Sequence, residues 1–225
     1  MIDAALARAE GCYLVSIPTI GENLDILASL RGTNNLLLDL IERPWFVHGC
    51  QKQIVKTYKD CYDQLYQKVK DSDGGVMAHY VWGPGRTTAL QNDFSCMISP
   101  EMFTEFAIPY YERQLEAVDH AWYHLDGEGA LKHIDALLEI PKIKAIQWVA
   151  GTKNEEYGYH DGSPRWYPYT KKVLAAGKNL MLGVPLSEVE SVVHEFGPRG
   201  LFIGVHGIPD REAGESLLKA ALKWK

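Results

Sequence analysis

The sequence repeats one pattern along most of its length: a short apolar run, a polar stretch, and then residues with helical periodicity. The apolar runs are continuous rather than alternating with polar residues, which is typical of strands buried on both faces of a parallel sheet. Because parallel neighbours need a crossover connection, strands alternating with helices predict an α/β fold. The predicted strands are 12–17, 75–81, a central run that begins at 121, 143–149, 179–184 and 201–206.

The helices are predicted from periodicity and from their end signals. Ser99 is a predicted N-cap, with Pro100 in the first helical position and Glu101 in the first turn, and Pro109 is expected to kink or interrupt this helix. Two long connections, residues 82–98 and the segment after Gly151, are predicted to be loops with a binding role, although packed and solvated tyrosines explain the second one nearly as well. The other predicted helices are 22–30, 34–42, 45–69, a stretch around 130–138, 165–176, 186–196 and 210–223.

The central run ends in a cluster of ionisable residues. His124, Asp126 and Glu128 occupy every second position, so in strand register they face the same side. Carboxylates beside an imidazole suit a metal site, a general acid–base pair or substrate hydrogen bonding. Gly127 and Gly129 allow a sharp turn and a close approach to a ligand. A satisfied polar cluster or a helix N-cap is the alternative interpretation.

Repeating strand–helix units either close into a barrel or form an open, doubly wound sheet. Neither Gly-x-Gly-x-x-Gly nor Gly-x-x-x-x-Gly-Lys-Ser/Thr follows a predicted strand, so a dinucleotide-binding or P-loop fold has no support. We therefore predict a single domain, residues 1–225, with a (β/α)₈ TIM-type barrel. Barrel sites lie at the carboxyl ends of the strands, and the polar or aromatic residues predicted there are Asp93, His124, Asp126, Trp148 and His206.

Charge and cysteine content exclude several classes of function. The formal net charge is −6 and no block of lysine or arginine occurs, which argues against nucleic acid or an anionic membrane as the main partner. The apolar runs are too short to span a bilayer and no secretory signal is recognisable, so we expect a cytoplasmic protein. The four cysteines, at 12, 50, 61 and 96, lack Cys-x-x-Cys spacing and are expected to be reduced thiols.

Several motifs resemble a known family. Ser-Pro-Glu-Met-Phe at 99–103, followed by Ile-Pro-Tyr at 108–110, is the most specific. The others are Ile-Pro-Thr at 17–19, Leu-Arg-Gly-Thr at 30–33, Asp-Leu-Ile-Glu-Arg-Pro at 39–44, His-Leu-Asp-Gly at 124–127 and His-Gly-Ile-Pro at 206–209. On these motifs the chain resembles the uroporphyrinogen decarboxylase superfamily, which includes corrinoid-linked methyltransferases. The resemblance implies a (β/α)₈ barrel, normally of a longer chain, with a cleft for a tetrapyrrole or a methyl-transfer substrate.

The first departure from the family concerns the start of the barrel. The first strand region, which in the decarboxylases contributes a basic motif and an essential aspartate, has no counterpart, so about six strand–helix units are expected. The missing strands would belong to a longer protein or to another chain, or the barrel would be open. An open edge exposes unpaired backbone groups, so we expect a homodimer or a second chain to cover it.

The second departure concerns the metal. Members that activate a thiol resemble one another in holding zinc with a His-x-Cys pair and a later cysteine, whereas here Asp126 takes the first cysteine's place and no cysteine follows Cys96. Imidazole and carboxylate still suit zinc. The predicted metal ligands are His124, Asp126 and His206, and the pattern looks more like members that demethylate methoxylated or methylamine-type substrates.

The leading hypothesis is a methyltransferase that passes a methyl group from a small methoxylated or N-methylated compound to a corrinoid protein. The leaving oxygen or nitrogen must be stabilised by a metal, with zinc expected, or by a proton. His124 and Asp126 would bind the metal or orient the substrate, and His206 would act as acid–base group or further ligand. Asp93 would form a hydrogen bond with the substrate. The other predicted substrate-binding residues are Trp82, Arg86, Trp148 and Glu128.

Two other functions stay open. A porphyrinogen decarboxylase needs cations for a substrate with many carboxylates, and the chain offers few candidates beyond Arg86 and Arg165. A non-catalytic, truncated barrel that binds a ligand or a partner chain is the third possibility. The remaining histidines are predicted to be structural or solvent-facing: 48, 79, 120, 133, 160 and 194.

Overall fold

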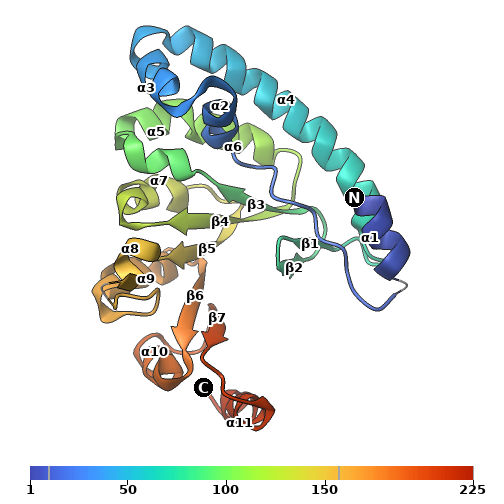
Figure 1. Cartoon of the computed structure of the whole chain (residues 1–225), viewed down its shortest axis with the longest axis vertical. Helices are drawn as coiled ribbons and strands as arrows, with labels where there is room; N and C mark the ends of the chain where they lie inside the picture. Colours follow the sequence, from blue (N-terminus) through green and yellow to red (C-terminus); the bar gives the residue numbers. More distant parts are fainter. Residues whose placement is uncertain (10, 157, 225) are drawn as a thin grey trace. The chain divides into compact units, whose positions relative to one another are not determined.

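The computed structural model describes residues 1–9, 11–156 and 158–224. Strands alternate with helices, and five strands form a parallel sheet (Figure 1). Its order is β3 (Thr87–Gln91), β4 (His120–Asp126), β5 (Ile143–Val149), β6 (Asn179–Pro185) and β7 (Leu201–His206). The α/β class is therefore confirmed. Contacts divide the chain into two compact units, Met1–His124 with Lys132–Lys144, and Leu125–Leu131 with Ala145–Lys225. The division falls within β4, and the units are described separately.

The first unit holds most of the helices. In chain order its elements are α1 (Ile2–Ala9), α2 (Leu24–Arg31), α3 (Thr33–Glu42), α4 (Pro44–Val69), β1 (Val76–Ala78), β2 (Val81–Gly83), β3 (Thr87–Gln91), the 3₁₀ helix η1 (Asp93–Met97), α5 (Pro100–Phe106), α6 (Ile108–Leu115), β4 (His120–Asp126, which continues into the second unit) and α7 (Ile134–Leu138).

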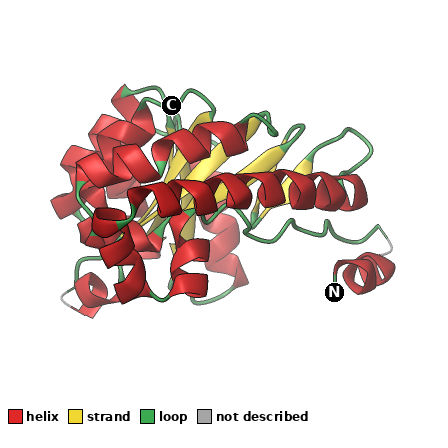
Figure 2. Ribbon diagram, turned by 90° about the horizontal axis from the view of Figure 1, so that it is seen from above, coloured by secondary structure: helices red, strands yellow, loops and turns green. Residues whose placement is uncertain are grey.

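Helix α4 is the main covering element of the first unit and the longest helix in Figure 2. Its buried residues recur every three or four positions, so they form one face of the helix. That face reaches β3: the Tyr58 hydroxyl donates to Thr88 Oγ1 (3.1 Å) and the Tyr62 hydroxyl to the carbonyl of Thr87 (2.8 Å). Burial raises the pKa of both tyrosines, so they remain neutral donors.

Strand β3 corrects the prediction of a loop over residues 82–98. The sequence Thr-Thr-Ala-Leu-Gln is a strand, and its first four residues are buried. It pairs in parallel with β4, from Thr87 opposite His120 to Gln91 opposite His124. Two adjacent threonines suggest a polar loop, but their hydroxyls bond within the protein and their β-branched side chains favour a strand.

The two strands predicted before β3 also differ from the structure. Residues 12–17 form no strand; Ile17 alone makes an isolated parallel bridge, to Ala78. The run 75–81 contributes to an antiparallel hairpin, β1 and β2, because the chain turns at His79 and Tyr80. The helix start predicted at Ser99 is confirmed, because the Ser99 side chain accepts the Met102 N–H (3.2 Å). The predicted interruption lies at Ala107, between α5 and α6, and Pro109 is in the first turn of α6.

The second unit is built on β6. Its elements are the 3₁₀ helix η2 (Glu128–His133, which continues into the first unit), β5 (Ile143–Val149), α8 (Thr152–Glu156), the 3₁₀ helix η3 (Pro164–Trp166), α9 (Tyr167–Ala175), β6 (Asn179–Pro185), the 3₁₀ helix η4 (Leu186–Glu188), α10 (Val189–Phe196), β7 (Leu201–His206) and α11 (Arg211–Ala221). Strand β6 pairs in parallel with β5 and β7, and Leu180, Met181, Leu182 and Val184 form its core. The predicted bounds of β5 and β7 are confirmed, while α8 lies within the predicted loop.

Strand β7 and helix α11 contribute little to this core. No residue of either element is buried, and Phe202 on β7 is 49% exposed. Within the described part of the chain, β6 is the only strand that pairs with β7. One edge of the sheet therefore ends at a strand whose outer backbone groups face no described strand.

Asp161 connects two strand ends of the second unit. Its Oδ1 accepts the N–H of Ala150, directly after β5 (2.7 Å), and its Oδ2 accepts the N–H of Gly183 in β6 (3.0 Å). A Cβ on Gly183 would lie 2.7 Å from Asp161 Oδ2, so only glycine leaves room for this contact. The carboxyl ends of β5 and β6 are thus tied together by one side chain.

None of the helices in the described part of the chain combines the length and the apolar character needed to cross a membrane.

Candidate functional site

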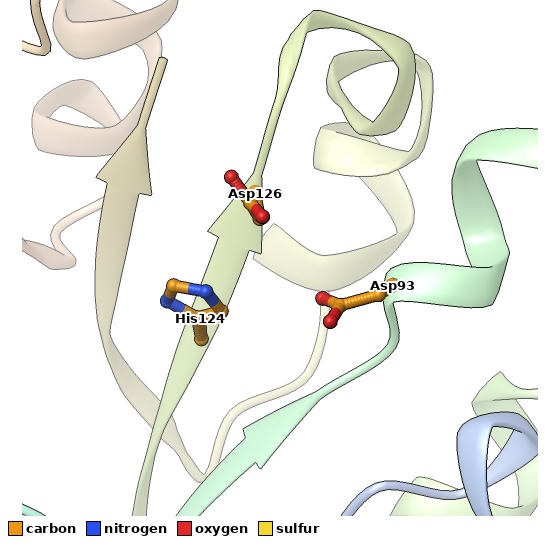
Figure 3. A group of neighbouring side chains, drawn as sticks. All are labelled: Asp93, His124 and Asp126. Carbon is orange, nitrogen blue, oxygen red and sulfur yellow. The ribbon is translucent and has the colours of Figure 1, made fainter. Parts of the chain in front are cut away.

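The main cluster of polar side chains consists of Asp93, His124 and Asp126 (Figure 3). One potential ligand atom from each lies within 4.8 Å of the other two. His124 and Asp126 share one face of β4 because they are two residues apart. Gln91 pairs with His124, so the chain two residues beyond Gln91 reaches the level of Asp126, and there Asp93 begins η1. Three residues predicted from the sequence are therefore brought together.

Asp25, which the sequence analysis missed, holds Asp93 in position. Its Oδ2 accepts the backbone N–H of Asp93 (2.8 Å) and its Oδ1 that of Phe94 (2.7 Å), so one carboxylate caps the start of η1. Burial raises the pKa of Asp25 to about 6; its two backbone hydrogen bonds lower the pKa, and the neighbouring carboxylates of Asp93 and Glu22 raise it. No local motif marks this residue, since an aspartate in the first turn of a helix is ordinary.

Aromatic side chains and hydrogen bonds support the backbone on both sides of Asp93. The Tyr111 hydroxyl donates to the carbonyl of Gln91 (2.8 Å), and its ring meets that of Tyr123 edge-on at 5.8 Å between centroids. His133, predicted to be structural, is buried; its Nε2 donates to the carbonyl of Ser95 (2.8 Å) and its ring stacks on Phe103. These contacts fix the backbone that presents Asp93.

The turn after Asp126 depends on a glycine. Gly127 has φ 76°, in the left-handed region that favours glycine, and its N–H donates to the carbonyl of Val149 (2.9 Å). Gly129 is not in this region, so Gly127 alone provides the predicted turn. Gly151 also has a positive φ, 81°, and a Cβ there would lie 3.5 Å from Gly127 Cα. Both positions favour glycine because of their positive φ, and the turns after β4 and β5 lie in contact.

A cavity of about 790 Å³ lies at this turn, within the second unit. Its lining includes Asp126, Glu128, Lys153 and Arg165. Glu128 Oε1 accepts from Arg165 Nη2 (2.9 Å), and the guanidinium lies over the ring of Tyr159, 4.9 Å from its centroid. Glu128, predicted to bind substrate, therefore lies in a cavity that also contains a candidate metal ligand.

Trp148 and Arg86, also predicted to bind substrate, lie elsewhere. Trp148 is buried and packs edge-on against Trp166 at 5.1 Å between ring centroids, which makes it a core residue. Arg86 precedes β3, and its carbonyl accepts the N–H of Asp119 (2.7 Å) at the amino ends of β3 and β4. Its guanidinium stacks on Tyr66, 4.6 Å from the ring centroid. Since β4 is about 20 Å long, Arg86 lies at the opposite end from Asp126.

The last two predicted residues, Trp82 and His206, lie outside the metal cluster and outside the cavity at Asp126. The Trp82 indole N–H donates to Asp71 Oδ2 (2.8 Å) on the β1–β2 hairpin. His206 ends β7, and its ring lies 6.5 Å from that of His160, centroid to centroid. His160, predicted to be structural, contacts Glu188 (3.0 Å) and lines with His206 a second cavity of about 450 Å³. Among the described residues, the candidate metal cluster does not include His206, so its role as a ligand stays a prediction.

The donor set fits a divalent metal. Catalytic zinc sites use three protein ligands from histidine and carboxylates and keep one position open. The ligand atoms of Asp93, His124 and Asp126 lie within 4.8 Å of one another. Ligand atoms on a tetrahedral zinc lie about 3.3 Å apart, so binding requires an approach of at most about 1.5 Å. Asp93 is exposed and His124 half-buried, so the cluster is accessible to a substrate.

A scan of protein-family models finds none that matches this chain, and a comparison with curated proteins also finds no match. The resemblance to the uroporphyrinogen decarboxylase superfamily therefore stays a prediction based on its motifs.

Proposed function

We propose that this protein is a metal-assisted methyltransferase of the uroporphyrinogen decarboxylase superfamily, which transfers a methyl group from a small methoxylated or N-methylated compound to a corrinoid carried by a partner protein. The observation that carries the proposal is the cluster of Asp93, His124 and Asp126 at the carboxyl ends of two parallel strands. In α/β folds this end of the sheet is where substrates bind.

The strand order supports the barrel part of the proposal. Each strand from β3 to β7 is added beside the preceding one, whereas a doubly wound sheet reverses direction at a switch point. Sequential order is the winding of a (β/α) barrel. A barrel-type wall is therefore part of the proposal, with Asp93, His124 and Asp126 at the carboxyl ends of β3 and β4.

The chemistry requires help at the atom that the methyl group leaves. When the carbon–oxygen or carbon–nitrogen bond breaks, its electron pair remains on the heteroatom, and the methyl group would pass to the corrinoid, whose cobalt in the reduced Co(I) state supplies the electron pair of the new bond. A bound divalent metal supplies Lewis acidity at that heteroatom. Asp93, His124 and Asp126 would hold it, and the two carboxylates would balance its charge. Asp25 would act as a positioning residue, because it fixes the backbone of Asp93.

The proposal is tested by metal binding. We expect close to one zinc per chain by elemental analysis, and a loss of affinity of at least about 100-fold by calorimetry in His124→Ala and in Asp126→Asn, since each removes one of three ligands. His194→Ala, an exposed histidine on α10, and Asp60→Asn, an exposed carboxylate on α4, are matched controls and should bind zinc like the wild type.

Methyl transfer itself is then measured with a methoxylated donor and a free corrinoid acceptor that has been reduced to Co(I). The variants that lose zinc should lose transfer. Zinc affinity that is equal in the wild type, His124→Ala and Asp126→Asn would rule the site out.

A further inference from the structure

We infer that the cavity of the second unit contains a subsite for a carboxylate, and that Arg165 binds this group. The inference rests on the proposed function and deepens it: the methylated substrate would be an organic acid. The cavity is lined mainly by the segments that follow β4 and β5. Asp126, a candidate metal ligand, is also part of the lining. A substrate could therefore contact a metal ligand and Arg165 at the same time.

The charge of the cavity favours an anion once a metal is bound. Its charged lining residues are two carboxylates, Asp126 and Glu128, and two cations, Lys153 and Arg165. These charges balance in the metal-free protein. When Asp93 and Asp126 balance the charge of a bound divalent cation, Glu128 alone opposes Lys153 and Arg165, and this excess of one positive charge attracts an anionic group of the substrate.

Arg165 is held in one orientation. Its guanidinium lies over the rings of Tyr159 (4.9 Å) and Trp166 (5.1 Å), and Trp166 is fully buried. Glu128 fixes the Nη2 end of the group. A guanidinium offers five N–H donors in a planar fork, so it can bind a second carboxylate through two of them and keep its contact with Glu128.

The Glu128–Arg165 ion pair is expected to add little to the free energy of unfolding. The two side chains are 52% and 44% exposed, and exposed ion pairs contribute little to the free energy of unfolding. Instead, Glu128 keeps the guanidinium oriented before the ligand arrives, which lowers the entropic cost of binding. Glycines, Val149 and Ala150 leave room along the wall for the hydrocarbon part of a small organic acid, and Thr152 and Asn154 add polar groups to it.

The subsite is tested by direct binding, with 4-methoxybenzoate as the acid and 4-methoxybenzamide as its neutral counterpart. Calorimetry on the zinc-loaded wild type should show the acid binding at least tenfold more tightly than the amide. Arg165→Gln should abolish this preference and leave amide binding unchanged, while Arg165→Lys should retain part of it because a point charge replaces the fork. Arg199→Gln, an exposed arginine outside the cavity, is the matched control and should behave as the wild type does.

Equal binding of acid and amide by the wild type would overturn the subsite, as would an unchanged preference in both Arg165 variants. Thermal melts show whether each variant is folded. Because zinc content is measured separately, the two proposals can fail independently. A preference for the acid without any zinc site would support the subsite and reject the metal-assisted reaction. A zinc site without a preference for the acid would support the metal site and reject the carboxylate subsite.

Discussion

At the scale of single residues, Asp25 gives the clearest dependence on pH. Its pKa in the folded protein is about 6, above the ordinary value of 3.8, so between these two values the folded state holds a proton that the unfolded state has lost. This favours the folded state at low pH, and the advantage disappears as the pH rises through 6. We expect the stability of the wild type relative to Asp25→Asn to fall by on the order of 1 to 2 kcal/mol from pH 4 to pH 7.

Urea unfolding of both proteins across this pH range measures the difference. The titration of His133, whose pKa is lowered by burial, acts in the opposite direction but is present in both proteins and cancels. Asp73→Asn, at an exposed turn, is the control and should show no such trend. Parallel stability curves for the wild type and Asp25→Asn would contradict the prediction.

Residues of the candidate site could be predicted where local register determines them. His124 and Asp126 share a face because of strand periodicity, and Asp93 follows the neighbouring strand. Asp25 could not be predicted, because its contacts are with backbone groups 68 and 69 residues away. The same holds for Arg86, whose place at the amino ends of β3 and β4 depends on a strand that the sequence analysis missed.

At the scale of elements, the N-caps of two helices can be compared. Ser99 caps α5, which buries Phe103 and Phe106, whereas Asp210 caps α11, in which no residue is buried. We expect Ser99→Ala to cost about 1 kcal/mol in the free energy of global unfolding, because the cap belongs to a helix that packs on the core. Asp210→Ala should cost clearly less and should mainly increase fraying of α11. Urea unfolding followed by circular dichroism gives both values, and an equal loss in the two variants would refute this.

Elements with strong end signals could be predicted and those without could not. The prolines at 44, 100 and 109 and the caps of α5 and α11 determine where helices begin. The polar strand β3 was missed because its threonines find their hydrogen-bond partners only through tertiary contacts. Residues 12–17 are apolar enough for a strand but pair through Ile17 alone. Apolar composition does not specify pairing.

At the scale of the whole molecule, the edge strand β7 is the expected site of self-association. An edge strand with exposed apolar side chains tends to pair with another chain, and Phe202 is such a side chain. We expect self-association in sedimentation equilibrium at micromolar concentrations. Phe202→Lys should shift the protein toward the mass of one chain, whereas Leu38→Lys, at an exposed position on α3, should not. A single-chain mass for the wild type at every concentration would refute the expectation of a homodimer.

The contact of Asp161 with Ala150 and Gly183 has a consequence for how such a protein can change over evolutionary time. Tyr159, which lies under Arg165, belongs to the segment that precedes Asp161, whereas Asp161 itself holds Ala150 and Gly183 at the ends of β5 and β6. Mutations, insertions or deletions within that segment can therefore alter the shape of the pocket while the ends of β5 and β6 keep their places. Substrate specificity can therefore change through this segment without a change in the strands that support it.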